Sequence, residues 1–591
     1  MSVHPAGLPK LSADLLLLHA PAVFEFRNRR DLYFPFLGTS GDVPITPLYE
    51  YFPVGFKTLQ RFLGDRGFDI KLLNLASVFV RYPQLPVDRV FEALDVQVVG
   101  IDLHWMIHVQ GALDIAERLK KARPDIKILL GGISSTYYAT ELIRYPFIDF
   151  VMRGYDTHEP MLALLSALKH GGSVASVQNL LYKDASGTVH ETDFGYKPET
   201  YGCGIDWSMQ PVTPKVKGFP IKEILSTQNA GCAYNCPWCG GSRDAFRRIF
   251  GKKRAMARKP DAEIQYEIES MRRLPGASNY HFYSVGSYNE STERLLWFIR
   301  ELATTELKSV SFEQFHLTPP DVLDAMGKLP ARVSLTLSPE SHDPVIAKHS
   351  GRGVYSNEEL ENWIPRAVDA GIAGIDIWFF IGMPHQTEDS CKGSVDYAAT
   401  LLEKFKGMPV NPMVCPMIPF LDPASNIFEK PEDYGYKVFF RTCEEHRRGM
   451  ERASLINRMN YETAWLSRSD LVRVGFEQVA RLMQAKAAIG MLPKSAVQRY
   501  CDKIADAWTF LQAVHEADNV VDLKERARAL ESLGDEIQKR NDQVLFAGVA
   551  NQALPVNRQI GGRWFDELGW EPTELDRVAT ASIASTASVA P

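Results

Sequence analysis

Three cysteines within eight residues are the strongest chemical signal in the sequence. Cys232, Cys236 and Cys239 have a C-x₃-C-x₂-C spacing and follow directly after an expected strand over 223–227. Three thiolates in one loop suit a soft metal or an iron–sulfur cluster. A structural zinc site usually has four ligands in two separated pairs, and no second pair lies nearby in the sequence. A [4Fe–4S] cluster with one iron free for another ligand accounts for the odd number. The alternatives are a zinc knuckle closed by a distant ligand and a chance grouping of buried cysteines.

The spacing, the aromatic residue before the last cysteine and the position after the first strand of a βα series resemble the radical S-adenosylmethionine (SAM) superfamily. The resemblance implies that Cys232, Cys236 and Cys239 hold a [4Fe–4S] cluster whose free iron binds the amino and carboxylate groups of SAM. It also implies that the reduced cluster cleaves SAM to a 5′-deoxyadenosyl radical. Trp238 then stands at the position that usually lies near the adenine.

Further positions are similar to the SAM-binding segments of that superfamily. Ser338, Glu340 and Arg352 follow an expected strand over 333–337, where polar groups bind the ribose hydroxyls and a basic residue meets the SAM carboxylate. Such oxygens accept hydrogen bonds from ribose, and arginine pairs with a carboxylate. The alternative is that Glu340 and Arg352 are surface charges. Gly382 begins a turn that matches the Gly-Pro-Gly-Glu-Thr type in part, and the segment after the second strand lacks the acidic residue often found there.

The N-terminal region alternates apolar strands with amphipathic helices. The expected strands are 15–20, 70–73, 96–101, 126–130 and 148–152. Between the third and fourth strands, apolar residues recur at i, i+3, i+4 and i+7 from Ala112 to Leu119, which indicates one face of a helix. Continuous apolar strands joined by helices predict a Rossmann-like, doubly wound parallel sheet.

Small and polar residues stand where these strands end. They are Asp102, His104, Gly131, Gly132, Ser134 and Gly154. A doubly wound sheet binds ligands at the carboxyl ends of its strands. Glycines let the backbone approach a bulky ligand. No G-x-G-x-x-G pattern is present to favour NAD.

Together with the cysteine motif downstream, this layout resembles the cobalamin (B12)-binding radical SAM proteins, in which a Rossmann-like domain precedes the barrel. The resemblance implies that the strand-end residues bind cobalamin, namely Asp102, His104, Gly131, Gly132, Ser134 and Gly154. Cobalamin domains that ligate cobalt through histidine use Asp-x-His-x-x-Gly after the first strand. Here Asp102 and His104 follow a later strand, and Ile107 stands in the glycine position. We therefore expect cobalamin bound without a histidine lower ligand.

A second βα series begins near residue 216. Its expected strands are 223–227, 280–285, 310–315, 333–337, 375–381 and 414–418. A closed barrel of this type has about eight strands, so these strands predict a partial (β/α)₆ barrel. Long helical patterns such as 471–489 then predict an α-helical C-terminal domain. The expected division is 1–215, cobalamin-binding domain and linker; 216–430, radical SAM barrel; 431–577, helical domain; and 578–591, disordered tail.

The composition is that of an ordinary soluble globular protein, with 45% apolar and 23% charged residues among 591. Lys and Arg number 66 against 72 Asp and Glu, and this net charge of −6 gives no support to nucleic-acid binding. No apolar run approaches the roughly 18 residues that a membrane helix needs, and no signal-peptide pattern begins the chain. We therefore expect a cytoplasmic protein without a membrane span. The five scattered cysteines are expected to be inert.

The resemblance implies three cofactors: a [4Fe–4S] cluster, SAM and cobalamin. We expect a methyltransferase that acts on an unactivated carbon of a small-molecule or peptide substrate. It would need a low-potential electron donor such as flavodoxin or ferredoxin, because SAM cleavage needs a strongly reducing cluster. The alternatives are oxidative cyclisation, oxygenation or rearrangement with the same cofactors, and a non-catalytic cobalamin sensor or carrier with a structural cluster.

Overall fold

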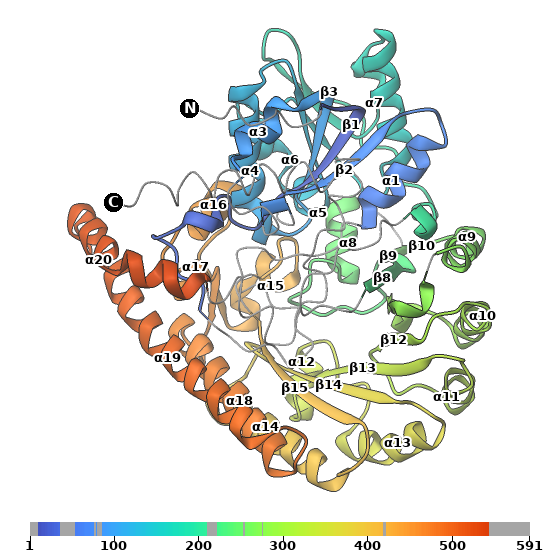
Figure 1. The fold of residues 1–591 in the computed structure, drawn as a ribbon, viewed down its shortest axis with the longest axis vertical. Helices are drawn as coiled ribbons and strands as arrows, with labels where there is room; N and C mark the ends of the chain where they lie inside the picture. The colour runs from blue at the N-terminus through green and yellow to red at the C-terminus, as the bar shows by residue number, and fades with distance from the viewer. Residues whose placement is uncertain are drawn as a thin grey trace, which may run out of the picture.

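The structure is a computed structural model that describes residues 10–35, 54–75, 78–79, 85–209, 222–251, 255–274, 276–417 and 421–542. It contains an N-terminal α/β domain, a half-barrel and an arm of long C-terminal helices (Figure 1). The expected tail over 578–591 and the last residue of the expected strand 414–418 lie outside the described residues.

The N-terminal domain is built on a seven-stranded sheet with the order β2-β1-β3-β4-β5-β6-β7. Its parallel strands are β1 (Leu11–His19), β2 (Ile70–Asn74), β3 (Leu94–Asp102), β4 (Lys127–Gly131) and β5 (Phe150–Met152). The antiparallel strands are β6 (Leu180–Lys183) and β7 (Val189–Glu191). The doubly wound parallel sheet is therefore confirmed, and the β6–β7 hairpin extends it by two strands that the sequence did not predict.

Both faces of this sheet are covered, which explains its continuous apolar strands. Leu15 and Leu17 of β1 belong to one buried cluster, whereas Leu16 and Leu18 belong to another, because successive side chains of a strand point to opposite faces. The covering helices are α1 (Val54–Gly64), α3 (Val87–Glu92), α4 (Val109–Ala122), α5 (Ile133–Tyr137), α6 (Ala139–Leu142) and α7 (His158–His170). The strand order reverses between β1 and β3, and ligands of such sheets bind at this type of position.

The half-barrel has six parallel strands in the order β15-β14-β13-β12-β11-β8. The strands are β8 (Lys222–Thr227), β11 (Tyr280–Val285), β12 (Ser309–Gln314), β13 (Arg332–Glu340), β14 (Gly374–Ile381) and β15 (Val410–Pro416). The expected partial barrel is therefore correct. Four helices lie along the outer side of the sheet in Figure 1: α9 (Asp261–Arg272), α10 (Thr292–Leu302), α11 (Pro320–Gly327) and α13 (Asn357–Asp369).

The C-terminal helices connect the edge of the half-barrel to the N-terminal domain. They are α18 (Arg468–Ala488), α19 (Lys494–Asp518) and α20 (Leu523–Asp542). α18 packs against β15, and α20 returns to the start of the chain, where the Asn541 side chain donates to the carbonyl oxygen of Leu32 at 2.7 Å. Among the described residues, no helix has the length and apolar character needed to cross a membrane.

The region after residue 430 is not purely helical. β16 (Tyr436–Val438) and β17 (Tyr461–Thr463) form an antiparallel pair. Between them, α16 (Cys443–Met450) packs against α4 of the N-terminal domain, and Arg447 forms an ion pair with Asp114 at 2.6 Å. One apolar cluster contains residues of all three regions, for example Val98, Leu225 and Leu511. The N-terminal domain and the half-barrel are therefore packed on a shared core.

Candidate functional site

The cysteine loop lies between β9 (Asn229–Gly231) and α8 (Arg243–Phe250), after the carboxyl end of β8. Backbone N–H groups point at two of the sulfurs: Tyr234 donates to Cys232 Sγ at 3.3 Å, and Gly241 donates to Cys239 Sγ at 3.4 Å. Hydrogen bonds to sulfur are one of the means by which proteins adjust iron–sulfur clusters. The loop therefore presents its sulfurs with donors already in place.

Burial raises the pKa of all three thiols. The pKa of Cys236 rises to about 12, although the nearby Arg352 guanidinium opposes this change. The pKa of Cys232 is also raised, and that of Cys239 is raised well above its ordinary value by burial and then by the Asp422 charge. The thiolate is the form that binds metal. Metal binding at this loop would therefore release protons.

The donor set fits an iron–sulfur cluster better than a single ion. Within the described parts of the chain, no three Cys, His, Asp or Glu side chains gather closely enough to hold one metal ion. A cubane cluster does not need such convergence, because each thiolate binds a different iron. Cys232 and Cys239 also remain partly accessible, as expected of side chains that face an internal space.

Arg352 and Glu340 form a buried ion pair behind the cysteine loop. Arg352 Nη1 donates to Cys236 Sγ at 2.7 Å, and its Nε lies 3.0 Å from Glu340 Oε1. The guanidinium also lies over the Phe315 ring, 3.3 Å from its centroid. Glu340 is 0% exposed, and burial raises its pKa to about 7 against the influence of Arg352. The alternative that these two residues are surface charges is therefore wrong.

Gly351 permits this close contact between Arg352 and the cysteine loop. Gly351 has a φ of +84°, and a Cβ there would lie 2.7 Å from the Cys236 Cα. Any side chain at this position would push the Arg352 segment away from the loop. The glycine is therefore needed for the guanidinium to reach the Cys236 sulfur.

The other residues expected to bind SAM lie at the same end of the half-barrel. The carbonyl oxygen of Ser338 accepts from Arg352 Nε at 3.2 Å, so its backbone supports the ion pair. Trp238 is half-buried, 6.2 Å from Phe380 between ring centroids, and its Nε1 has no hydrogen-bond partner among the described residues. That indole nitrogen is itself buried. The roles of Ser338 and Trp238 toward SAM remain proposals.

Gln386 explains why the turn at Gly382 forms although its sequence departs from the expected type. Gln386 Oε1 accepts from the N–H groups of Gly382 and Met383 at 2.8 and 2.9 Å. Its Nε2 donates to the Phe380 carbonyl oxygen at 2.7 Å. Gly382 itself has a φ of +102° and its carbonyl oxygen accepts from the Tyr436 hydroxyl. A glutamine side chain therefore closes the turn.

The glycines of the N-terminal domain have two different roles. Gly132 has a φ of +115°, and a Cβ there would lie 2.8 Å from the backbone of Leu103. Gly154, with a φ of +144°, is similarly confined by the backbone of Asp156. Gly131 instead borders open space, with no atom within 4 Å of its Cβ position. Gly132 and Gly154 thus shape the strand ends, whereas only Gly131 leaves room for a ligand.

Asp102 and His104 lie near the point where the strand order reverses. Asp102 is buried and accepts from His19 Nδ1 at 2.9 Å, and the His19 ring lies 4.9 Å from the His108 ring. Burial opposes ionisation of Asp102, but the neighbouring histidines, His19 above all, lower its pKa. His104 is exposed, and desolvation lowers its pKa although the Asp102 charge acts in the opposite direction. Asp102 is therefore paired with His19, a residue that the sequence did not point to.

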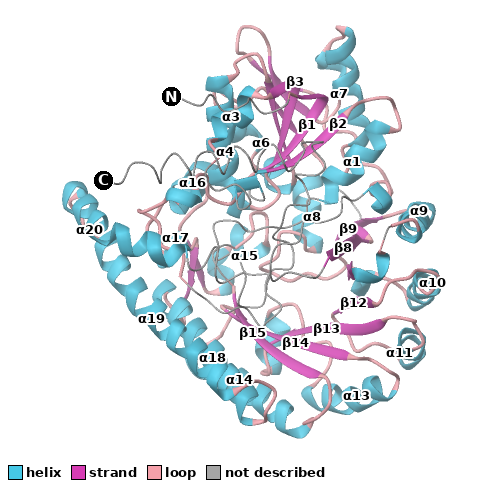
Figure 2. Cartoon of the chain, in the orientation of Figure 1, coloured by secondary structure: helices cyan, strands magenta, loops and turns pink. Residues whose placement is uncertain are grey.

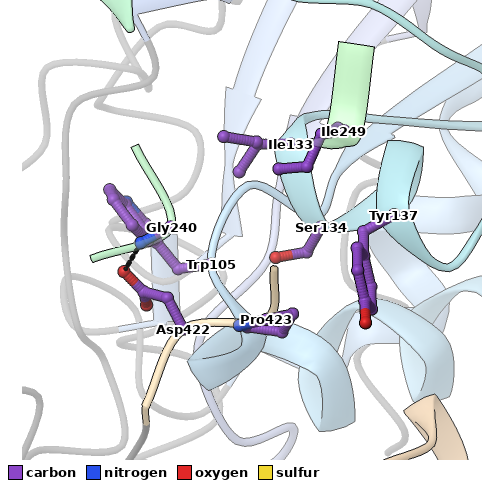
Figure 3. Close-up of a pocket in the computed structure, with 8 residues that line it drawn as sticks. All are labelled: Trp105, Ile133, Ser134, Tyr137, Gly240, Ile249, Asp422 and Pro423. Atoms are coloured by element: carbon purple, nitrogen blue, oxygen red, sulfur yellow. Dashed lines mark hydrogen bonds between the residues drawn. The ribbon is translucent and has the colours of Figure 1, made fainter. Parts of the chain in front are cut away.

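One small cavity is lined by residues from both expected cofactor regions (Figure 3). Its lining comprises Trp105, Ile133, Ser134, Tyr137, Gly240, Ile249, Asp422 and Pro423. Ser134 comes from the N-terminal domain, where its hydroxyl donates to the His104 carbonyl oxygen at 2.9 Å. Gly240 directly follows Cys239. The structure therefore brings Ser134 and the cysteine loop to the same cavity. The other residues expected to bind cobalamin do not line it, namely Asp102, His104, Gly131, Gly132 and Gly154.

Hydrogen bonds across the domain boundary hold this cavity in place. The Tyr137 hydroxyl donates to Glu429 Oε1 at 2.7 Å, and the Tyr145 hydroxyl donates to Glu444 Oε2 at 2.7 Å. Both partners follow the half-barrel in the sequence. The N-terminal domain is therefore fixed to the segment after β15 as well as to the shared core.

Sequence reasoning missed Asn289 and Asp422 at this site. Asn289 Oδ1 accepts from the Ala233 N–H at 2.9 Å and lies 3.5 Å from Cys232 Sγ, so it supports the start of the cysteine loop. It follows β11, where the sequence analysis looked for an acidic residue alone. No local pattern connects Asp422 with the cysteines, because it lies far from them in the sequence. Asn289 ends the short 3-10 helix η6 (Ser287–Asn289), and Asp422 lies in an irregular segment between β15 and α15 (Asn426–Glu429). Figure 2 shows the strands of the half-barrel with helices along their outer side.

Comparisons with known proteins agree with this architecture. Residues 42–163 match the model of the B12 binding domain, and residues 229–398 match the model of the radical SAM superfamily. The chain thus combines a B12-binding domain with a radical SAM domain, which is the class of protein that the sequence predicted. No curated protein matches the sequence.

Two solved structures illustrate the same overall fold. The radical SAM methyltransferase TsrM from Kitasatospora setae, with cobalamin and a [4Fe–4S] cluster bound, is 14% identical. The match covers 90% of this chain and 99% of that chain with a TM-score of 0.54. The cobalamin-dependent radical enzyme OxsB, with aqua-cobalamin and SAM bound, is 12% identical; the match covers 98% of this chain and 80% of that chain with a TM-score of 0.52. At these identities the similarity shows the fold alone.

Proposed function

We propose that this protein is a cobalamin-dependent radical SAM enzyme, and that it transfers a methyl group to an unactivated carbon. The observation that supports this proposal best is the cavity that Ser134 of the N-terminal domain shares with Gly240 of the cysteine loop. A cofactor at the strand ends of the first domain and a cofactor on the cysteine loop would then meet at one place. TsrM and OxsB have the same fold and bind these cofactors.

Different residues of the chain would bind the different cofactors. Cys232, Cys236 and Cys239 would bind the cluster, and Ser134 and Gly131 border the space for cobalamin. When bound, the cluster supplies the electron that cleaves SAM, and cobalamin supplies the methyl group. Arg352 places a positive charge 2.7 Å from Cys236 Sγ and thereby favours the thiolate.

The protein also orients and shields the reacting groups. Asn289 and the backbone N–H groups hold the cysteine loop in one conformation. The N-terminal domain contributes Trp105, Ile133, Ser134 and Tyr137 to the lining of the cavity. Exclusion of water from such a site strengthens electrostatic interactions and protects reactive species. A small-molecule or peptide substrate and a low-potential electron donor such as flavodoxin or ferredoxin complete the proposal.

Anaerobic reconstitution with iron, sulfide and cobalamin tests the proposal. The reduced protein should convert SAM to 5′-deoxyadenosine, and Cys236→Ala should not. A protein that carries a complete cluster but forms no 5′-deoxyadenosine would instead be the non-catalytic cobalamin sensor or carrier. This outcome would refute the enzymatic proposal.

The reaction type needs a separate measurement. SAM labelled on its methyl group should yield a labelled product in an anaerobic extract supplied with the protein. A product that forms without the label would point to oxidative cyclisation, oxygenation or rearrangement. Either result leaves the assignment of the cofactors unchanged.

A further inference from the structure

We propose that Asp422 is a positioning residue that holds the cysteine loop at the shared cavity and makes a cluster bound there harder to reduce. This inference rests on the proposed function, because it assumes that the loop binds an iron–sulfur cluster. It assigns a role to a carboxylate that belongs to neither the cysteine motif nor the expected cofactor contacts.

The first observation is a direct hydrogen bond between Asp422 and the cysteine loop. Asp422 Oδ2 accepts from the N–H of Gly240, the residue after Cys239, at 2.9 Å (Figure 3). A Cβ at Gly240 would lie 2.8 Å from the Asp422 Cβ and 3.1 Å from the Pro423 carbonyl oxygen. The glycine therefore lets the carboxylate approach the loop backbone closely.

The second observation is that the segment carrying Asp422 is itself anchored to the loop. The Ile427 N–H donates to the Pro237 carbonyl oxygen at 2.8 Å. The Asn426 side chain donates to Asp244 Oδ2 at 3.2 Å, at the start of α8. The segment thus contacts the loop on both sides of its last cysteine, at Pro237 and at Gly240, and it also contacts α8. Asp422 is held at a defined position rather than on a free surface strand.

The third observation concerns charge. None of the ion pairs recorded for the described residues includes Asp422, and the side chain lines the cavity with its carboxylate directed at Gly240 (Figure 3). Burial raises the pKa of Asp422 to about 6, whereas the hydrogen bond from the Gly240 N–H lowers it. A negative charge beside Cys239 opposes the addition of an electron to a cluster. Net charge and hydrogen bonding near the sulfurs set cluster potentials over a wide range.

Two substitutions separate the hydrogen bond from the charge. Asp422→Asn keeps an oxygen that can accept from Gly240 but removes the charge, whereas Asp422→Ala removes both. Glu432→Gln is the matched control, because Glu432 is exposed and lies ten residues further along the same segment. Each full-length variant is reconstituted anaerobically. Iron and sulfide content, the midpoint potential from an EPR-monitored redox titration, and cobalamin content are then measured.

We expect Asp422→Asn to keep the wild-type iron content and to shift the midpoint potential to a more positive value. Asp422→Ala should lose part of the iron as well, and Glu432→Gln should match the wild type in every measurement. An unchanged potential in Asp422→Asn would overturn the effect of the charge. Full iron content in Asp422→Ala would overturn the positioning role. If the wild type itself binds no cluster, the proposed function fails, and that result differs from either of these.

Discussion

The two adjacent glycines at the end of β4 provide a sharp test of the N-terminal site. The structure predicts that substitution of Gly132 damages the fold, whereas substitution of Gly131 damages ligand binding. Gly132 has φ +115° and ψ 176°, a backbone conformation almost restricted to glycine, and alanine there costs about 1–3 kcal/mol. Its Cβ would also lie 2.8 Å from the Leu103 carbonyl group, and the backbone shift that relieves this contact costs about 1–3 kcal/mol more.

Gly132→Ala should therefore lower the free energy of unfolding of the N-terminal domain by about 2–6 kcal/mol, out of the roughly 5–15 kcal/mol typical of a domain. Gly131→Ala should instead raise the free energy of unfolding. No atom lies within 4 Å of its Cβ position, and a glycine-to-alanine change at an unstrained position stabilises by about 0.4–1 kcal/mol. The larger Gly131→Leu should fill the open space and reduce cobalamin retention.

Urea unfolding of the cobalamin-free chain, followed by circular dichroism, measures the first effect as a shift of the first transition. Absorbance of the reconstituted protein measures the cobalamin retained by Gly131→Leu. If Gly132→Ala were as stable as the wild type, the close packing of this turn against Leu103 would be wrong. If Gly131→Leu retained a full equivalent of cobalamin, the open space beside β4 would not belong to the cofactor site.

Three further predictions concern the cysteine loop, the buried ion pair and pH. Cys236→Ala should abolish iron loading but leave cobalamin retention largely unchanged, and the control Cys391→Ala should keep its iron. If Cys236→Ala lost both cofactors, the two cofactors would not bind at separate sites. Arg352→Met leaves Glu340 buried without its cation and should lower the free energy of unfolding by about 3–5 kcal/mol, whereas adding Glu340→Gln should restore part of it. If the free energy of unfolding did not recover in the double variant, the buried Arg352–Glu340 ion pair would be wrong. Burial disfavours charged His158, but its hydrogen bonds to Asp156 and Cys203 raise its pKa from 6.5 to about 9. The resulting stabilisation of about 3 kcal/mol is complete below pH 6.5 and is lost as the pH rises through 9. Urea titrations between pH 6.5 and 9 should show that the free energy of unfolding depends less on pH in His158→Gln than in the wild type. An unchanged pH dependence would refute the raised pKa of His158.

Much of the architecture could be read from local sequence patterns. The five parallel strands of the first sheet, the six-stranded half-barrel and the long helices after residue 468 follow from hydrophobic patterns, which depend on neighbouring residues. The cysteine spacing is local in the same sense. The β6–β7 hairpin was missed because its two strands have only four and three residues, which carry little periodic signal.

The site itself depended on contacts between distant residues. Arg352 reaches Cys236 across 116 positions of sequence, and Asp422 reaches Gly240 across 182. The structure also places Arg352 against a cysteine and a buried glutamate, two contacts that the sequence did not predict. No local pattern carries such information, because the pairing depends on the order of strands and on how the chain returns after the barrel.

The sequence by itself determined the cysteine trio, the two successive βα domains and the class of chemistry that this combination supports. Tertiary structure alone decided which glycines shape a turn and which border open space, and which charges are buried together. It also decided that Ser134 and the cysteine loop share one cavity. The physical reason is that spacing and periodicity act within a few residues, whereas burial, charge pairing and cavity shape arise only when distant segments pack against each other.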